Sequence, residues 1–154
     1  MMPATFEETV NGLGLRFFSG LQAITGSAKS RITVKKKNAR NLDGSVRLDD
    51  DLKSLYPTAN RWDYVVAYNL RNKSFLFYIE IHPACATSET KKVIAKKEWL
   101  DDWLKGEGQR LKNYTSKVFY YWVATDRVSP LDSPARKIIA RKGIKGPVRN
   151  LEIK

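Results

Sequence analysis

The sequence contains very few of the residues that form disulfides and zinc sites. It has one cysteine, Cys85, and one histidine, His82, among 154 residues. A single cysteine cannot close an internal disulfide, and one cysteine with one histidine cannot complete a four-ligand structural zinc site. These two counts exclude a disulfide-stabilised scaffold and a zinc-stabilised fold.

Long apolar runs and a basic leader are also missing. No apolar run approaches the roughly 20 residues that a membrane helix requires. The first ten residues, MMPATFEETV, contain acids but no lysine or arginine. These absences predict a soluble, cytoplasmic protein. With 42% apolar residues, the chain is long enough to form one globular domain, which we expect to span 1–154.

Acidic residues are outnumbered by basic ones, and the basic residues are clustered. The chain has 28 lysines and arginines against 16 acids, a net charge of +12. Such a charge attracts polyanions, so DNA or RNA is the expected partner, with an ordinary solvated basic surface as the alternative. Two stretches are nearly free of acids, and from them we expect these phosphate contacts: Lys35, Lys36, Lys37 and Arg40 in the first, and Arg141 and Lys142 in the second.

Hydrophobic periodicity and turn residues predict a mixture of helices and strands. Because an aromatic segment follows a long helix, we expect its strand to run parallel to the strand before that helix. The result is an α/β domain with a mixed sheet flanked by helices. The expected elements are a helix over 5–24, a short strand at 32–34 followed by a loop, one or two helical turns within 47–60, a hairpin of strands at 61–68 and 74–82, a helix from 87 or 88 to 105, a strand at 117–125, a helix at 133–142, and a short strand within 147–153.

The second hairpin strand, SFLFYIEIH, ends in polar residues. Side chains alternate along a strand, so Glu80 and His82 point to the same face. If the turn is centred on Arg71 and Asn72, Asp63 lies opposite Glu80, and a shift of one residue places Asp63 opposite His82. In either register the two carboxylates lie about 4.5 to 8 Å apart, measured between Cβ atoms.

Two carboxylates at this separation need a neutralising group. Two ionised carboxylates about 5 Å apart repel by roughly 3 kcal/mol at an effective dielectric constant of 20. A shared proton, a lysine or arginine, or a divalent cation would each remove this repulsion, and oxygen ligands favour Mg²⁺ or Mn²⁺. The pattern leaves a structural ion-pair network and a metal site as two open alternatives.

An acid on one strand, the sequence EIH on the next, a lysine-rich helix and an aromatic strand together resemble the PD-(D/E)XK, or restriction-endonuclease-like, nuclease superfamily. That family has an α-β-β-β-α-β core with an aspartate on the second core strand and a glutamate-x-lysine on the third. The resemblance covers roughly Phe6 to Thr125. It implies that Asp63 and Glu80 bind Mg²⁺ or Mn²⁺ for nucleic-acid cleavage, and analogy with nucleases suggests a homodimer. The chain departs from the family pattern where Trp62 replaces the proline and His82 replaces the lysine.

Some members of this family recruit a lysine from the helix that follows. Lys92 and Lys96 lie within about 60° of Trp99 and Trp103 on a helical wheel. Either lysine can lean toward the acids; we place Lys92 with Asp63, Glu80 and His82 as a catalytic candidate, and Lys96 with the nucleic-acid contacts. In the alternative arrangement, the tryptophans close the edge of the core and the lysine stems lie over them.

The role of His82 stays open among three possibilities. It can act as a metal ligand, as a general base, or as a strand-end residue that is hydrogen bonded to Glu80 or a carbonyl. A nucleophilic pair with Cys85 is disfavoured because no residue is in place to orient it. The missing strand lysine also leaves open a second class of function, a non-catalytic nucleic-acid-binding or protein-interaction module on the same fold.

Overall fold

The computed structural model describes residues 3–126 and 133–154. Within them, a five-stranded sheet has the order β2-β3-β4-β5-β6, and a two-stranded sheet pairs β1 with β7. The strands are β1 (Ile32–Val34), β2 (Leu42–Arg47), β3 (Tyr64–Leu70), β4 (Lys73–His82), β5 (Val118–Ala124), β6 (Ile144–Val148) and β7 (Leu151–Ile153). The helices are α1 (Phe6–Gly12), α2 (Leu48–Leu52), α3 (Ser88–Lys105), α4 (Gln109–Tyr114) and α5 (Ser133–Arg141), with 3-10 segments η1 (Gly26–Ser30) and η2 (Lys36–Asn41).

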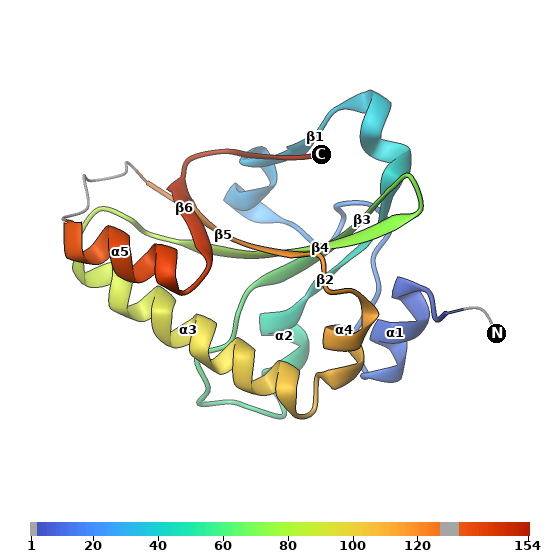
Figure 1. Cartoon of the computed structure of the whole chain (residues 1–154), viewed down its shortest axis with the longest axis horizontal. Coiled ribbons are helices and arrows are strands. Elements are labelled where there is room, and N and C mark those ends of the chain that lie inside the picture. The colour runs from blue at the N-terminus through green and yellow to red at the C-terminus, as the bar shows by residue number, and fades with distance from the viewer. Residues whose placement is uncertain (1–2, 127–132) are drawn as a thin grey trace.

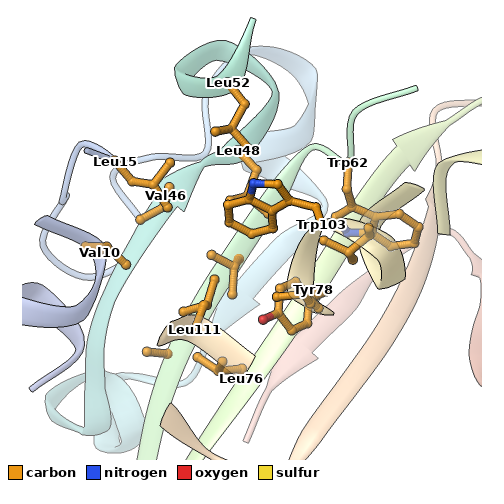
Figure 2. Packing of buried hydrophobic residues seen from close by; sticks show 14 of the residues in the cluster. Val10, Leu15, Val46, Leu48, Leu52, Trp62, Leu76, Tyr78, Trp103 and Leu111 are labelled. Atoms are coloured by element: carbon orange, nitrogen blue, oxygen red, sulfur yellow. The ribbon is translucent and has the colours of Figure 1, made fainter. Parts of the chain in front are cut away.

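The five-stranded sheet separates two layers. The α-helices lie on one side of it, and the small β1–β7 sheet lies on the other (Figure 1). Two apolar clusters lie on the helix side of the sheet, and one lies beneath the small sheet. Trp62, Tyr78 and Trp103 belong to the larger cluster on the helix side, part of which is seen in Figure 2. This architecture confirms the predicted α/β domain with a mixed sheet flanked by helices.

The predicted hairpin is confirmed, and it has the first of the two registers considered, with the turn centred on Arg71 and Asn72. Pairs run antiparallel from Tyr64 opposite Ile79 to Leu70 opposite Lys73. Arg71 and Asn72 form the turn with φ angles of 53° and 64°. Positive φ at both central residues is typical of the two-residue turn whose twist matches that of the strands. This register fixes which side chains of β4 face the helices.

The long helix and the strand after it also match the prediction. The helix α3 ends at Lys105, with Gly106 following. Strand β5 pairs in parallel with β4, with Glu80 opposite Trp122. The short strand at 32–34, the helical turn at 48–52 and the helix from Ser133 are present as well. Among the described residues, no helix is both long and apolar enough to cross a bilayer.

The N-terminal region differs from the prediction. The expected helix over 5–24 is wrong, because α1 ends at Gly12. Gly14 has a φ of 75°, and beyond it Phe18 forms a bridge with Ser45. The apolar residues after Gly14 therefore pack as an irregular segment, although their spacing imitates a helix.

Two other regions contain more structure than the sequence indicated. No strand was expected at β2, where Gly44, with a φ of 142°, interrupts the alternation at a bulge. The single strand expected near the C-terminus is in fact two strands, β6 beside β5 and β7 beside β1. These additions complete the sheet around the hairpin and place β2 beside β3.

Candidate functional site

The two predicted acids meet on the helix side of the sheet. Asp63 directly precedes β3, and Glu80 lies near the carboxyl end of β4. The amide of Asp63 donates to Oε1 of Glu80 at 3.1 Å, and the amide of Ile81 donates to Oδ2 of Asp63 at 2.8 Å. The predicted convergence of the two carboxylates is therefore confirmed, and main-chain donors hold both of them.

A lysine from α3 is paired with the buried acid. Nζ of Lys96 lies 2.5 Å from Oε2 of Glu80, whose side chain is 0% exposed. Lys92 lies one helical turn earlier, is 63% exposed, and contacts Oε1 of Glu89 at 3.3 Å. The two lysines thus occupy the reverse of their expected positions: Lys96, expected at nucleic acid, faces the acids, and Lys92, expected at the acids, faces outward.

His82 is held at the edge of the same cluster. Its Nε2 lies 2.6 Å from Oε2 of Glu89, and its Nδ1 lies 3.7 Å from Oε2 of Glu80. Its carbonyl accepts a hydrogen bond from Nε1 of Trp122 at 2.9 Å. Glu89 is a site residue that the sequence did not reveal, because an acid in the first turn of a helix is ordinarily explained by the helix dipole.

The cluster has more negative than positive charge. Two carboxylates face the single ammonium of Lys96, so one negative charge is left uncompensated when both acids ionise. Burial raises the pKa of Asp63 to about 6, although Lys96 and the amide of Ile81 act in the opposite direction. Burial also raises the pKa of Glu80 well above its ordinary value, and the neighbouring Asp63 raises it further.

The pKa of Lys96 is raised, whereas burial alone would lower the pKa of a lysine. Burial acts to lower its pKa, but the charges of Glu80 and Asp63 outweigh burial and raise the pKa above the ordinary lysine value. Lys96 is therefore charged at neutral pH and neutralises one of the two acids. The remaining negative charge favours either a proton or a second cation.

Acids from α2 add to the negative potential beside Asp63. The amide of Asp49 donates to the carbonyl of Asp63 at 3.3 Å. Asp49 and Asp50 both act to raise the pKa of Asp63, each less strongly than burial does. Arg61 contacts Oδ1 of Asp49 at 2.9 Å and so offsets part of this charge. These acids lie in the segment 47–60, for which the sequence predicted only one or two helical turns.

The donor set suits a hard divalent cation. Mg²⁺ prefers oxygen ligands and is commonly held by one or two carboxylates, with water and substrate phosphate completing its shell. Asp63 and Glu80 supply such oxygens, and a carboxylate oxygen that accepts one hydrogen bond keeps a second lone pair. Within 3–126 and 133–154, no group of three or more His, Cys, Asp or Glu side chains is arranged to hold a metal. A cation bound by this pair would therefore depend on water or phosphate for its other ligands.

The two basic stretches lie far from each other. The segment that contains Lys36, Lys37 and Arg40 is next to β3, where Nδ2 of Asn41 lies 3.3 Å from the hydroxyl of Tyr68. Tyr68 pairs with Phe75, which lies about 17 Å along β4 from Glu80, at the usual rise of a strand. Helix α5 and the cyan segment near residue 40 lie at opposite ends of the long axis (Figure 1).

Only the C-terminal basic stretch lies near α3. Arg141 is exposed at the end of α5, and Nζ of Lys142 lies 3.4 Å from Oε2 of Glu98 on α3. The exposed Lys35, Lys36, Lys37 and Arg40 therefore do not face Arg141 and Lys142 across the acids. The two stretches do not form a single clamp around one phosphate backbone.

Comparisons with known proteins give no match. No family model, no curated protein and no solved structure is similar to this chain. The functional assignment therefore depends on the geometry and the charges of the site itself.

Proposed function

We propose that this protein is a divergent, metal-dependent nuclease of restriction-endonuclease-like fold that hydrolyses DNA or RNA phosphodiesters. The observation that carries the proposal is the pair of Glu80, which is fully buried, and Asp63, which is half-buried: main-chain amides hold both carboxylates, and the ammonium of Lys96 lies beside them. When both acids ionise, Lys96 neutralises only one of the two charges. The elements α1, β2, β3, β4, α3 and β5 support the family relationship, because they follow the order of the family's α-β-β-β-α-β core once the intervening η1, β1, η2, α2 and α4 are set aside.

In this proposal, Asp63 and Glu80 hold Mg²⁺ or Mn²⁺. When bound, such a cation supplies positive charge to a phosphoryl oxygen and lowers the pKa of a water molecule. Lys96 replaces the missing strand lysine. Its Nζ keeps Glu80 in position, and because an ammonium has three donors and the side chain is 24% exposed, it has donors left for a phosphate oxygen.

His82 and Glu89 form the outer part of the proposed site. A hydrogen bond between Nε2 of His82 and Glu89 fixes the orientation of the imidazole ring and directs Nδ1 toward Glu80. Trp122 holds the main chain of His82 through its carbonyl. These contacts orient the imidazole of His82 beside the buried carboxylate.

A non-catalytic module on the same fold is the second candidate. The Lys96–Glu80 ion pair favours it, because a site already holding an internal cation has less need of a metal. In that case, a proton on Asp63 or Glu80 would remove the remaining charge, and the acids would serve the fold. The two candidates differ in whether cleavage depends on a divalent cation and on Glu80.

Cleavage assays separate the two candidates. Incubation of supercoiled plasmid and of a folded RNA with Mg²⁺ or Mn²⁺ should give cleavage by the native chain, and EDTA should abolish it. Glu80→Gln should reduce the rate to background, because the neutral amide removes the charge that the cation requires. Glu107→Gln, at an exposed glutamate after α3, is the matched control and should retain the native rate.

Two outcomes would reject the nuclease proposal. If Glu80→Gln cleaves as fast as the native chain, the activity does not come from this site. If neither substrate is cut in either metal by a folded native chain, the non-catalytic module is supported.

A further inference from the structure

The sheet face opposite the acids has a column of aromatic rings. Phe75 and Phe77 come from β4, and Phe119 and Tyr121 come from β5. The ring centroids of Phe75 and Phe119 are 6.2 Å apart, those of Phe77 and Phe119 are 5.3 Å apart, and those of Phe77 and Tyr121 are 6.2 Å apart. Interplanar angles of 19° to 24° make the rings nearly parallel. Neighbouring strands thus present a continuous stack.

Basic side chains surround this column. Nζ of Lys145 on β6 lies 4.8 Å from the ring centroid of Phe119 and 5.7 Å from that of Tyr121. Lys73, the first residue of β4, is exposed and by strand alternation points to the same face as the rings, and the exposed Lys117 directly precedes β5. The basic segment η2 adjoins this end of the sheet, because Asn41 contacts Tyr68 and the Tyr68 ring lies 6.4 Å from that of Phe77.

Acids are scarce on this face. Among the residues of β4, β5 and β6, Glu80 is the one acid, and its side chain lies on the opposite face with Asp63. Just outside these strands, Asp126 accepts a hydrogen bond from the amide of Ala84 at 2.9 Å, and Oε2 of Glu152 lies 3.8 Å from Nζ of Lys154. The face therefore combines aromatic rings with uncompensated positive charge.

The small sheet covers only part of this face. Ile32 of β1 and Leu151 and Ile153 of β7 belong to the apolar cluster that packs on the sheet at Val66 and Ile79. Phe77 is 5% exposed and belongs to that core. Three rings of the column, Phe75, Phe119 and Tyr121, are only half-buried and lie at the margin of the cluster.

We propose that this face binds a single-stranded nucleic acid. Unpaired bases stack on half-buried aromatic rings, while lysines and arginines hold the phosphates, and together these contacts bind single strands with little sequence preference. Phe75, Phe119 and Tyr121 supply the rings, and the phosphates lie along Lys73, Lys117, Lys145 and the η2 segment. A duplex fits this face less well, because its bases are already stacked on one another.

This inference also gives the first basic stretch a role in binding nucleic acid. Lys35, Lys36, Lys37 and Arg40 lie too far from Asp63 and Glu80 to act there, but they adjoin the aromatic column. The binding face and the proposed metal site lie on opposite faces of the sheet. Either can therefore fail without the other.

Fluorescence anisotropy with labelled oligothymidylate, oligouridylate and a DNA duplex tests the inference in EDTA. The native chain should bind both single strands more tightly than the duplex. Tyr121→Leu combined with Phe119→Leu should weaken single-strand binding at least about tenfold, because the apolar volume remains while the stacking surface is lost. Lys145→Ala should reduce the dependence of log affinity on log salt by roughly one phosphate contact.

Three controls keep the test decisive. Lys105→Ala, an exposed lysine at the end of α3, should leave binding unchanged, and so should Asp102→Asn, an exposed acid on the same helix. Thermal unfolding should show that the double leucine variant is folded at the assay temperature. Unchanged binding by that folded variant, or equal affinity for duplex and single strand, would overturn the proposal.

Discussion

Replacing Lys96 with methionine should lower the free energy of unfolding by about 3 kcal/mol at neutral pH. Methionine matches the length of the lysine stem but removes the ammonium that lies 2.5 Å from Glu80. The carboxyl of Glu80 is 0% exposed and would then be buried without a cation. Because Glu80 can take up a proton, the expected loss of stability lies at the lower end of the range for broken buried ion pairs. Urea denaturation of both proteins measures the difference.

Two further variants show whether the loss comes from the ion pair. Lys92→Met changes a lysine that is 63% exposed on the same helix and should cost less than about 0.5 kcal/mol. Lys96→Met combined with Glu80→Gln removes both charges and should recover most of the stability, because a neutral amide is cheaper to bury than a carboxylate. If Lys96→Met unfolds at the same urea concentration as the native chain, the Lys96–Glu80 ion pair does not contribute to stability.

Asp63→Asn should raise the free energy of unfolding by about 2 to 3 kcal/mol near pH 8 in EDTA. Burial raises the pKa of Asp63 from 3.8 to about 6 in the folded chain. An acid with a raised folded pKa favours folding fully below its unfolded pKa, and this contribution is lost as the pH rises through the folded pKa. Above about pH 6, the native aspartate is therefore a half-buried, poorly solvated charge that asparagine avoids.

The gain in unfolding free energy should be large near pH 8 and small near pH 4. Near pH 4, the native Asp63 is largely protonated in the folded chain, so Asp63→Asn should gain little there. The asparagine oxygen can still accept from the amide of Ile81, which is 2.8 Å from the aspartate oxygen. Asp102→Asn, at an exposed acid on α3, is the matched control and should change stability little at either pH. A loss of stability near pH 8 in Asp63→Asn would contradict the assigned charge imbalance.

An acid pair that costs stability is itself informative. Natural proteins commonly keep strained or destabilising groups where function needs them. A purely structural role for Asp63 is better served by asparagine, which keeps the hydrogen bond to Ile81 without the buried charge. A stabilising Asp63→Asn substitution would therefore support a bound cation as the reason for the acid.

The hairpin and its acids were predictable because local rules determine them. The asparagine in the two-residue turn favours positive φ, and the turn then fixes the register that brings Asp63 beside Glu80. Strand alternation fixes the face on which Glu80 lies. The crossover through α3 to β5 followed from the apolar stripe of the helix and the aromatic strand after it.

Other features depend on tertiary contacts that periodicity does not encode. The residues after Gly14 have helical spacing, but Phe18 bridges to Ser45, so long-range strand contacts take precedence over local preference. Gly44 interrupts the alternation of β2 and conceals that strand.

The choice between Lys92 and Lys96 also required the structure. The two lysines are one helical turn apart, so they share a face on a helical wheel. Their difference arises from where α3 crosses β4, and this crossing brings Lys96, and not Lys92, to Glu80. The contact of Glu89 with His82 arises in the same way, from the docking of the first turn of α3.

Calorimetric titration with Mn²⁺ near pH 7.5 tests the central claim most directly. The native chain should bind one Mn²⁺ ion, and both Glu80→Gln and Asp63→Asn should abolish this binding while Glu107→Gln retains it. Absence of any Mn²⁺ binding by the folded native chain, or equal binding by Glu80→Gln, would contradict the assignment of these two carboxylates as a cation site.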